Sequence, residues 1–157
     1  MPSVLFVCTA NRYRSPIAAA CFNNELLQRR NETDWNILSA GTWTVDGLPP
    51  MPEAVKQAKE LGLDIREHRS RKITPKLIQQ TDLILTMEQG QKEALQNEFR
   101  DAATKVYLFS EVVDGIPYDI PDPVRDISNT EVASKICEMI HSGFENICNA
   151  AISMRHP

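Results

Sequence analysis

The sequence predicts an α/β fold, a three-layer sandwich with a four-stranded parallel sheet and helices on both faces. Short apolar runs typical of buried strands recur along the chain, and segments with apolar residues at helical spacing follow them. Strands that alternate with helices favour a parallel sheet, because the connecting helices then cover both of its faces. Ligands of such sheets bind at the carboxyl ends of the strands, which is where functional residues are expected.

Four strands and four helices are expected in alternation along the chain. Ser15 followed by Pro16 signals a helix start, since serine can cap free backbone N–H groups and proline at the first helical position needs no N–H. Gly62 ends another helix in the usual C-terminal way. No repeat or linker divides the chain, so a single domain, 1–157, is expected. The strands are expected at residues 4–7, 36–40, 82–87 and 106–109, and the helices at 15–30, 52–61, 88–99 and 129–152.

The composition indicates a globular protein that does not bind nucleic acid. Hydrophobic residues at 42% and charged residues at 24% fit neither a disordered nor a fibrous chain. A net charge of −4 lacks the basic excess of domains that bind nucleic-acid phosphates, so any phosphate specificity must be local. The apolar runs are too short for a signal peptide or a membrane span. We therefore expect a cytoplasmic protein without membrane insertion.

The four cysteines, Cys8, Cys21, Cys137 and Cys148, are widely scattered. They form no Cys-x-x-Cys pair of the kind that builds zinc sites, so metal binding is not expected. A chain of 157 residues is also large enough to bury a continuous core without disulfides holding it together.

The segment from Cys8 to Ser15 is the strongest candidate for a functional site. It places a cysteine and an arginine at opposite ends of a loop between a strand and a helix. Backbone N–H groups of such a loop can converge on an anion, and the helix N-terminus adds roughly half a positive charge. Arg14 can add two parallel hydrogen bonds to phosphoryl oxygens, a geometry that lysine cannot reproduce. The other residues expected to bind the phosphate are Thr9, Ala10, Asn11, Arg12, Tyr13 and Ser15.

Cys8 is expected to be a thiolate nucleophile, because the field that favours a bound phosphate also favours a thiolate. Ser15 could hydrogen-bond the sulfur and help it leave, or it could cap the helix, which is the simpler role. The alternative is that Cys8 is an ordinary buried cysteine at a strand end. The joint pattern of strand, cysteine, five residues, Arg-Ser-Pro and helix favours the nucleophile.

Attack on a phosphomonoester also requires a proton for the leaving oxygen, which a carboxyl group can supply. The segment IPYDIPDPVRD offers three candidates, Asp119, Asp122 and Asp126. Asp122 stands between two prolines that restrict the backbone around it, so we choose Asp122 as the general acid. The alternative is that the prolines and aspartates only form a turn.

These residues resemble the low-molecular-weight protein tyrosine phosphatase family, whose nucleophile loop has the form Cys-x-x-Asn-x-x-Arg-Ser-Pro. Here the loop reads CTANRYRSP from Cys8 onward. The resemblance continues through SAGT at 39–42, LGLDIREHRSR at 61–71, DLILTM at 82–87 and the Asp-Pro pair at 122–123. It therefore spans nearly the whole chain.

The resemblance implies a four-stranded parallel sheet and an enzyme that hydrolyses phosphotyrosine monoesters. The implied mechanism is a phosphocysteine intermediate on Cys8, phosphate binding by Arg14, and proton donation by Asp122 followed by water activation. No cofactor is implied, the expected partners are phosphotyrosine-containing proteins, and a monomer or weak homodimer is expected. The resemblance also implies that Asn11, Ser39 and His68 form a polar network, which holds the phosphate loop, residues 8–15, in shape.

Two departures from the family pattern bear on regulation and specificity. Tyr13 stands where many members have a second cysteine that forms a protective disulfide with the nucleophile, so that redox switch is expected to be absent. Val124 and Arg125 stand where many members carry tyrosines in the cleft wall. Trp43, with Arg12 and Tyr13, is a candidate for an aromatic and basic rim that replaces this wall.

Three other functions fit the loop less well. An arsenate reductase would need further cysteines near Cys8 for its disulfide relay, and the chain has none between Cys21 and Cys137. A phosphocarrier domain would have little need of Arg14 or of an acid such as Asp122. A phosphoprotein-binding module without turnover would leave the nucleophile and the acid without a purpose.

Overall fold

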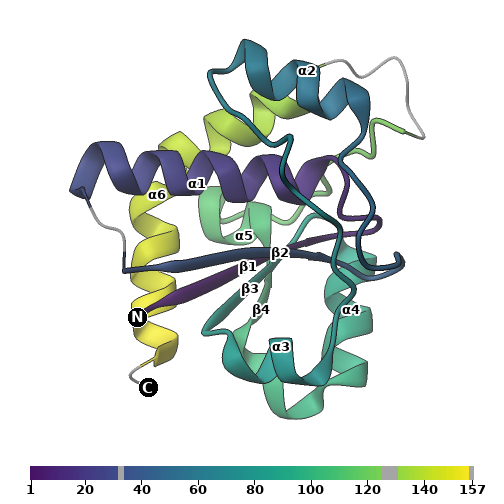
Figure 1. Ribbon diagram of the computed structural model, residues 1–157. Coiled ribbons are helices and arrows are strands. Elements are labelled where there is room, and N and C mark those ends of the chain that lie inside the picture. Colours follow the sequence, from purple (N-terminus) through teal and green to yellow (C-terminus); the bar gives the residue numbers. More distant parts are fainter. Residues whose placement is uncertain (32–33, 125–130, 156–157) are drawn as a thin grey trace.

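Four parallel strands form the central sheet, in the order β2-β1-β3-β4. The structure, a computed structural model, describes residues 1–31, 34–124 and 131–155. The predicted α/β class and the four-stranded parallel sheet are confirmed (Figure 1). The strands are β1 (Ser3–Cys8), β2 (Asn36–Gly41), β3 (Leu83–Thr86) and β4 (Val106–Leu108).

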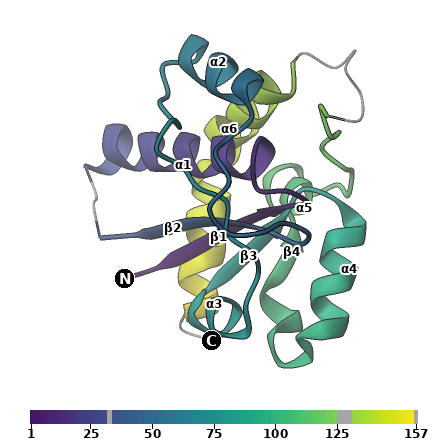
Figure 2. The ribbon, with the colours of Figure 1, turned by 45° about the vertical axis from the view of Figure 1, so that its right-hand side comes forward.

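Helices cover both faces of the sheet and complete the three layers (Figures 1 and 2). Among the described residues, none of these helices combines the length and the apolar character that crossing a membrane requires. One face carries α1 (Arg14–Arg30), α5 (Phe109–Asp114) and α6 (Val132–Arg155), with α2 (Pro52–Glu60) packed on α1 and α6. The other face carries α3 (Pro75–Gln80), α4 (Gln89–Glu98) and the 3₁₀ helix η1 (Arg100–Lys105).

The residues of β1 divide between the two cores because successive side chains of a strand point to opposite faces. Val4 and Phe6 enter the larger core with α1, α5 and α6, whereas Leu5 and Val7 enter the smaller core with α3 and α4. All four side chains are fully buried. The central strand therefore reads as a continuous apolar run, as expected for a strand that is covered on both faces.

The predicted long elements agree with the structure to within a few residues, and three short helices were missed. The elements α3, η1 and α5 have six residues each, which is too short for an amphipathic period to stand out. Phe109 was assigned to the fourth strand but begins α5. The start expected for the last helix, 129–130, lies outside the described residues.

A disulfide joins Cys21 of α1 to Cys137 of α6. The sequence pattern did not predict this pairing, because a chain of this length can bury a continuous core without a disulfide. The two cysteines are 116 residues apart in sequence, and they meet because α1 and α6 pack against each other on the same face of the sheet. Cys8 is not part of this disulfide and is a buried free cysteine.

The carboxyl ends of the strands bring distant segments together at one edge of the sheet. Cys8 at the end of β1 is opposite Gly41 of β2, and Thr86 of β3 lies opposite Leu108 of β4. Beyond β3, Met87 accepts a hydrogen bond from the backbone N–H of Ile120, at 2.9 Å. The loop after Cys8 and the Pro/Asp-rich segment around Ile120 thus meet at this edge.

Candidate active site

Cys8 ends a buried strand with its sulfur among polar groups. The residue is 2% exposed, and its Sγ lies 2.9 Å from the Ser15 hydroxyl oxygen. The backbone N–H of Asn11 donates to the same sulfur at 3.3 Å. Both groups can donate hydrogen bonds to the sulfur.

Asn11 ties the loop to three other segments. Its backbone is left-handed (φ 58°), and its fully buried side chain donates to the hydroxyls of Ser15 at 2.8 Å and Ser39 at 2.9 Å. The side-chain oxygen accepts from the backbone N–H of Arg71 at 2.8 Å. Asparagine tolerates the left-handed conformation better than most residues, and here these bonds hold it there.

His68 supports the same residue from the other side. Its Nε2 lies 2.7 Å from the Asn11 carbonyl oxygen, and since that oxygen can only accept, Nε2 is the donor. Burial, followed by the charges of Arg71 and Arg69, lowers the pKa of His68, although the bond to Asn11 acts in the opposite direction. A neutral imidazole protonated on Nε2 satisfies both observations. Asn11, Ser39 and His68 are therefore in contact.

The outer side of the loop rests on the segment that follows β2. Thr9 accepts a backbone hydrogen bond from Trp43 at 2.9 Å, and Arg12 accepts one from Met51 at 2.9 Å. A Cβ atom on Gly41 would lie only 2.6 Å from the Thr9 carbonyl oxygen. Only glycine at position 41 lets the loop pass this closely over the end of β2. Gly41 lies within the SAGT segment of the family resemblance, but the sequence pattern does not reveal this close approach.

Ser15 is not the helix cap that the sequence suggested. Helix α1 begins at Arg14 with Tyr13 as the N-cap, so Ser15 lies within the first turn. Its hydroxyl is occupied by Cys8 and Asn11 instead. In the part of the chain that the structure describes, no side chain caps this helix end. The first backbone N–H groups of α1 are thus left for the loop and for an anion.

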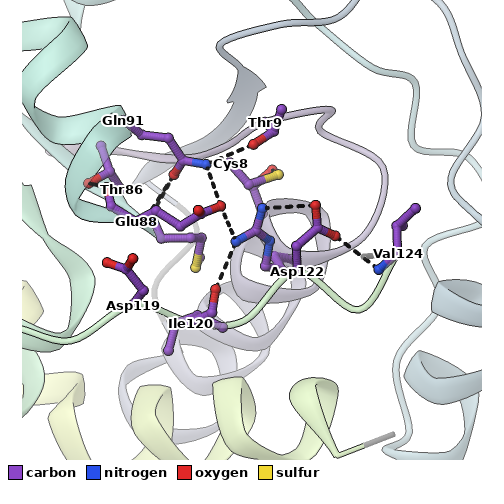
Figure 3. A network of polar contacts seen from close by, with 12 residues as sticks. Cys8, Thr9, Thr86, Glu88, Gln91, Asp119, Ile120, Asp122 and Val124 are labelled. Carbon is purple, nitrogen blue, oxygen red and sulfur yellow. Dashed lines mark hydrogen bonds and ion pairs between the residues drawn. The ribbon is translucent and has the colours of Figure 1, made fainter. Parts of the chain in front are cut away.

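Arg14 lies in a buried position between the carboxylates of Glu88 and Asp122, both of which are labelled in Figure 3. Its Nη1 donates to Glu88 Oε2 at 2.7 Å and to the Ile120 carbonyl at 2.8 Å. Its Nη2 lies 3.8 Å from Asp122 Oδ2. The side chain is 3% exposed, so the loops after β3 and α5 hold this guanidinium in place. Glu88 was missed from the sequence, where its position directly after a strand end was the available signal.

The three candidate acids differ in their surroundings. Asp122 is the carboxylate near Arg14, and its Oδ1 accepts from the backbone N–H of Val124 at 3.0 Å. Asp119 instead accepts from the backbone N–H of Gln89, the first residue of α4, at 2.8 Å. Asp126 lies outside the described residues. The structure therefore brings Asp122, rather than Asp119, to the arginine of the loop.

The expected aromatic rim is only partly formed. Trp43 is 83% exposed, next to the loop through its backbone bond to Thr9. Tyr13 is 7% exposed and packs in the core, where burial, followed by the charge of Glu53, raises its pKa. The Tyr13 side chain is therefore not part of the rim, because the loop turns it inward toward the core. Arg12 is partly exposed and donates to a backbone carbonyl of the loop after β2.

This arrangement indicates a class of chemistry. A thiol at a strand end, a loop closed by an arginine and a helix N-terminus can bind a phosphate dianion and attack it. No group of three or more His, Cys, Asp or Glu side chains among the described residues could hold a metal ion. The geometry therefore fits a phosphatase.

Comparison with known proteins places the chain within that class. The family model described as "Low molecular weight phosphotyrosine protein phosphatase" matches residues 3–155, and the chain belongs to this family. It is 32% identical over 91% of both chains to a probable low molecular weight protein-tyrosine-phosphatase, EpsP, of Ralstonia nicotianae. It is also 32% identical to a protein-arginine-phosphatase of Geobacillus stearothermophilus, over 76% of this chain and 77% of that one.

A solved structure of the arginine phosphatase YwlE superposes with a TM-score of 0.80. It is 28% identical and covers 89% of this chain and 91% of its own. That structure is a cysteine-to-serine mutant with a phosphorylated active site serine. The family assignment made from the motifs is confirmed, and the chain is a phosphatase of this family.

Proposed function

We propose that this protein hydrolyses phosphotyrosine monoesters in proteins through a phosphocysteine intermediate on Cys8. The observation that carries the proposal is the grouping of Cys8, Arg14 and Asp122 at one edge of the sheet. Cys8 Sγ faces donors from Asn11 and Ser15, and Arg14 at the end of the same loop lies 3.8 Å from Asp122. The phosphorylated serine of the YwlE mutant supports a phosphorylated nucleophile in this family.

The first step transfers the phosphoryl group to sulfur. The Cys8 thiolate attacks phosphorus, the S–P bond forms, and the P–O bond to the tyrosyl oxygen breaks as Asp122 donates its proton to that oxygen. In the second step the Asp122 carboxylate takes a proton from water, whose oxygen attacks phosphorus. The S–P bond then breaks and releases inorganic phosphate. The hydroxyl of Ser15, 2.9 Å from the sulfur, can stabilise the departing thiolate.

Arg14 is proposed to bind the phosphoryl oxygens in both steps. Nη1 already donates to Glu88 and Ile120, so a bidentate contact would use the Nε and Nη2 edge of the guanidinium. The backbone N–H groups of residues 9–15 are proposed to supply the remaining donors. These charges and dipoles stabilise the charge that develops in the transition state without having to reorganise.

The rim is proposed to select the substrate. Trp43 and Val124 are large apolar side chains that are 83% and 57% exposed, on segments adjoining the loop and the acid respectively. An exposed indole beside the phosphate loop suits an aromatic substrate, since aromatic pairs contribute about 0.5–1.5 kcal/mol beyond their burial. Phosphotyrosine is therefore the first candidate.

Phosphoarginine is the second candidate. It is favoured by the similarity to protein-arginine-phosphatases and by Val124, which stands where many members of the family carry tyrosines in the cleft wall. Initial rates on matched phosphotyrosine, phosphoserine and phosphoarginine peptides distinguish the substrates. Faster turnover of the phosphoarginine peptide would overturn the tyrosine assignment while leaving the cysteine mechanism in place.

The mechanism is tested with para-nitrophenyl phosphate in the absence of added metal. Wild-type protein should hydrolyse it, and Cys8→Ser should lose on the order of 10⁴-fold or more in kcat. Cys8→Ser should still bind inorganic phosphate, because the backbone N–H groups and Arg14 remain. Undiminished turnover by Cys8→Ser would show that Cys8 is not the nucleophile.

We further propose that residues 1–157 act as one domain, as a monomer or weak homodimer, in the cytoplasm. The family match over residues 3–155 supports a single unit. Sedimentation equilibrium checks the assembly, and cell fractionation checks the location. Thiols are kept reduced in the cytosol, whereas the structure has a disulfide between Cys21 and Cys137. Counting free thiols in rapidly quenched cells therefore shows whether these two cysteines are reduced there, as a cytoplasmic location requires.

A further inference from the structure

Gln91 of α4 contacts both Thr9 of the phosphate loop and Glu88, the carboxylate that pairs with Arg14. It is 7% exposed and occupies the third position of that helix. Its Nε2 lies 3.0 Å from the hydroxyl oxygen of Thr9 and 3.1 Å from Glu88 Oε2. Its Oε1 accepts from the backbone N–H groups of Met87 at 3.1 Å and Glu88 at 3.0 Å (Figure 3).

The orientation of this amide is determined by its partners. Two backbone N–H groups can only donate, so the atom that faces them must be the oxygen. The nitrogen then donates both of its hydrogens, one to the Glu88 carboxylate and one to the Thr9 hydroxyl. One side chain thereby uses its full hydrogen-bonding capacity, four bonds, on two segments of the candidate site.

The Gln91 amide positions the Glu88 carboxylate, which in turn positions Arg14. The same oxygen, Oε2, accepts from Gln91 and from Arg14 Nη1 at 2.7 Å. Glu88 also accepts from the backbone of Gln91 in a reciprocal capping box. Two donors on one oxygen leave the carboxylate little freedom to rotate, so the guanidinium is aimed by a carboxylate that is itself fixed.

Thr9 is the first residue after the nucleophile, and two elements hold it from opposite sides. Gln91 of α4 donates to its hydroxyl, and Trp43 donates to its carbonyl oxygen at 2.9 Å. Thr9 and the peptide that follows it are thereby oriented. An ordinary capping box would account for the bonds between Gln91 and Glu88, but it does not account for the bond to Thr9 on another segment.

We propose that Gln91 is a positioning residue that couples the orientation of the phosphate loop at Thr9 to that of Arg14 through Glu88. This inference rests on the proposed function, because it concerns how the same site binds the phosphoryl group. Gln91 does not itself touch the substrate. It keeps the two phosphate-binding elements in register, so that both meet the same phosphoryl group.

The central test is Gln91→Glu, which keeps the shape but replaces two N–H donors with an acceptor that is negative at neutral pH. The introduced carboxylate repels Glu88 and cannot donate to Thr9. We expect kcat/KM for para-nitrophenyl phosphate to fall by about 10–100-fold at neutral pH, given that misplacement by about 1 Å costs about 10²-fold. The inhibition constant of inorganic phosphate should rise in parallel.

The pH profile separates positioning from loss of packing. As pH falls, the introduced carboxyl binds a proton and can again donate to Glu88. The loss of kcat/KM in Gln91→Glu, relative to wild type, should therefore become smaller toward acid pH. Gln91→Leu, which has no proton to gain, should lose activity by the same factor at every pH. A loss of kcat/KM in Gln91→Glu that does not change with pH would contradict the proposal.

Gln96 offers a matched control on the same helix. It is a partly exposed glutamine whose amide donates to the backbone carbonyls of Ala103 and Val106, away from the site. Gln96→Glu and Gln96→Leu should leave kcat/KM within about twofold of wild type, as expected for substitutions outside the site. If the Gln91 variants match the Gln96 variants in activity, Gln91 is only a helix cap.

Coupling through Glu88 is tested by the double variant Glu88→Gln with Gln91→Glu. It exchanges the two groups, so that an amide again faces a carboxylate. Contacting residues give non-additive effects, and the loss in the double variant should be smaller than the product of the two single losses. Losses that simply multiply would show that the two residues act independently.

Thr9→Val provides a test that leaves the capping box of α4 intact, in case the Gln91 variants do not fold. It removes the acceptor for Nε2 and should lower kcat/KM and phosphate affinity with little change in melting temperature. Activity equal to that of Gln96→Leu would contradict the role of Thr9. Wild type and Cys8→Ser are run in the same assay. An inactive wild type, or an active Cys8→Ser, would refute the proposed function rather than this coupling.

Discussion

The phosphate loop and the acid loop meet at one edge of the sheet, but they are held very differently. In the phosphate loop, 8–15, Cys8, Asn11 and Ser15 are buried in one hydrogen-bonded cluster, and Arg14 is buried against Glu88. In the acid loop, 116–124, Ile120 is the one buried residue, and every residue of this segment is described. Its attachments to the end of β3 and the start of α4 run through Ile120 and Asp119.

This difference separates what is common to all substrates from what can vary. The phosphoryl group is the same in every phosphomonoester, so a preorganised loop can bind it with little reorganisation. The leaving group differs between substrates, and in the proposed binding mode it meets the exposed acid loop and the rim at Trp43 and Val124. Exposed loops tolerate change in sequence, so substrate preference can shift here while the chemistry stays the same.

The largest effect is expected from Arg14→Lys, within the phosphate loop. Lysine cannot make a bidentate contact, and its single ammonium group cannot also reach Glu88 and Ile120. We expect kcat/KM to fall on the order of 10³-fold, as for the loss of a preorganised oxyanion donor. Arg66→Lys is the control, since Arg66 is 73% exposed and pairs with Asp64 at the surface. A loss no greater than that of the control would show that the geometry of Arg14 does not matter.

Asp122→Asn addresses the acid loop. The loss should be on the order of 10²-fold for phenyl phosphate, whose leaving group needs a proton, and much smaller for para-nitrophenyl phosphate. Asp119→Asn should affect both substrates equally, because Asp119 accepts from the N-terminus of α4 rather than facing Arg14. Rates against leaving-group pKa provide the measurement. A leaving-group dependence in Asp119→Asn alone would assign the acid to Asp119.

Gly41→Ala tests how rigidly the phosphate loop must be held. The added Cβ would meet the Thr9 carbonyl oxygen at 2.6 Å, so the loop must shift by several tenths of an ångström. Activity should drop about tenfold, less than the roughly 10²-fold cost of a misplacement of about 1 Å. Gly90→Ala is the control, because nothing lies within 4 Å of its added Cβ and alanine favours the helix. Equal activity of the two variants would indicate a loop that adapts.

The smallest effect on activity is expected from breaking the disulfide. Cys21→Ser should lower the free energy of unfolding by about 2–4 kcal/mol, a typical disulfide contribution. Urea denaturation with and without reductant measures this. Turnover should change little, because Cys21 and Cys137 lie in α1 and α6, outside both loops. If turnover falls only for substrates that need Asp122, the acid loop depends on the anchoring of α6.

The sequence determined the fold class and the core of the site because both depend on local patterns. The apolar runs specify β1 and β3 directly, since strands covered on both faces need no polar residue. Cys8 and Arg14 are six residues apart at the two ends of one loop between a strand and a helix, so their place in one site could be inferred from the spacing. The prolines on either side of Asp122 distinguished it from the other two candidate acids.

Only the tertiary structure decided the contacts between residues that are distant in sequence. Glu88 and Gln91 approach Arg14 and Thr9 across more than 70 residues, because parallel strands bring their carboxyl ends to one edge. Ser15 resembles a helix cap in sequence, and only the position of Cys8 gives its hydroxyl another partner. The meeting of Cys21 with Cys137 likewise follows from two helices packing on one face, which no local pattern encodes.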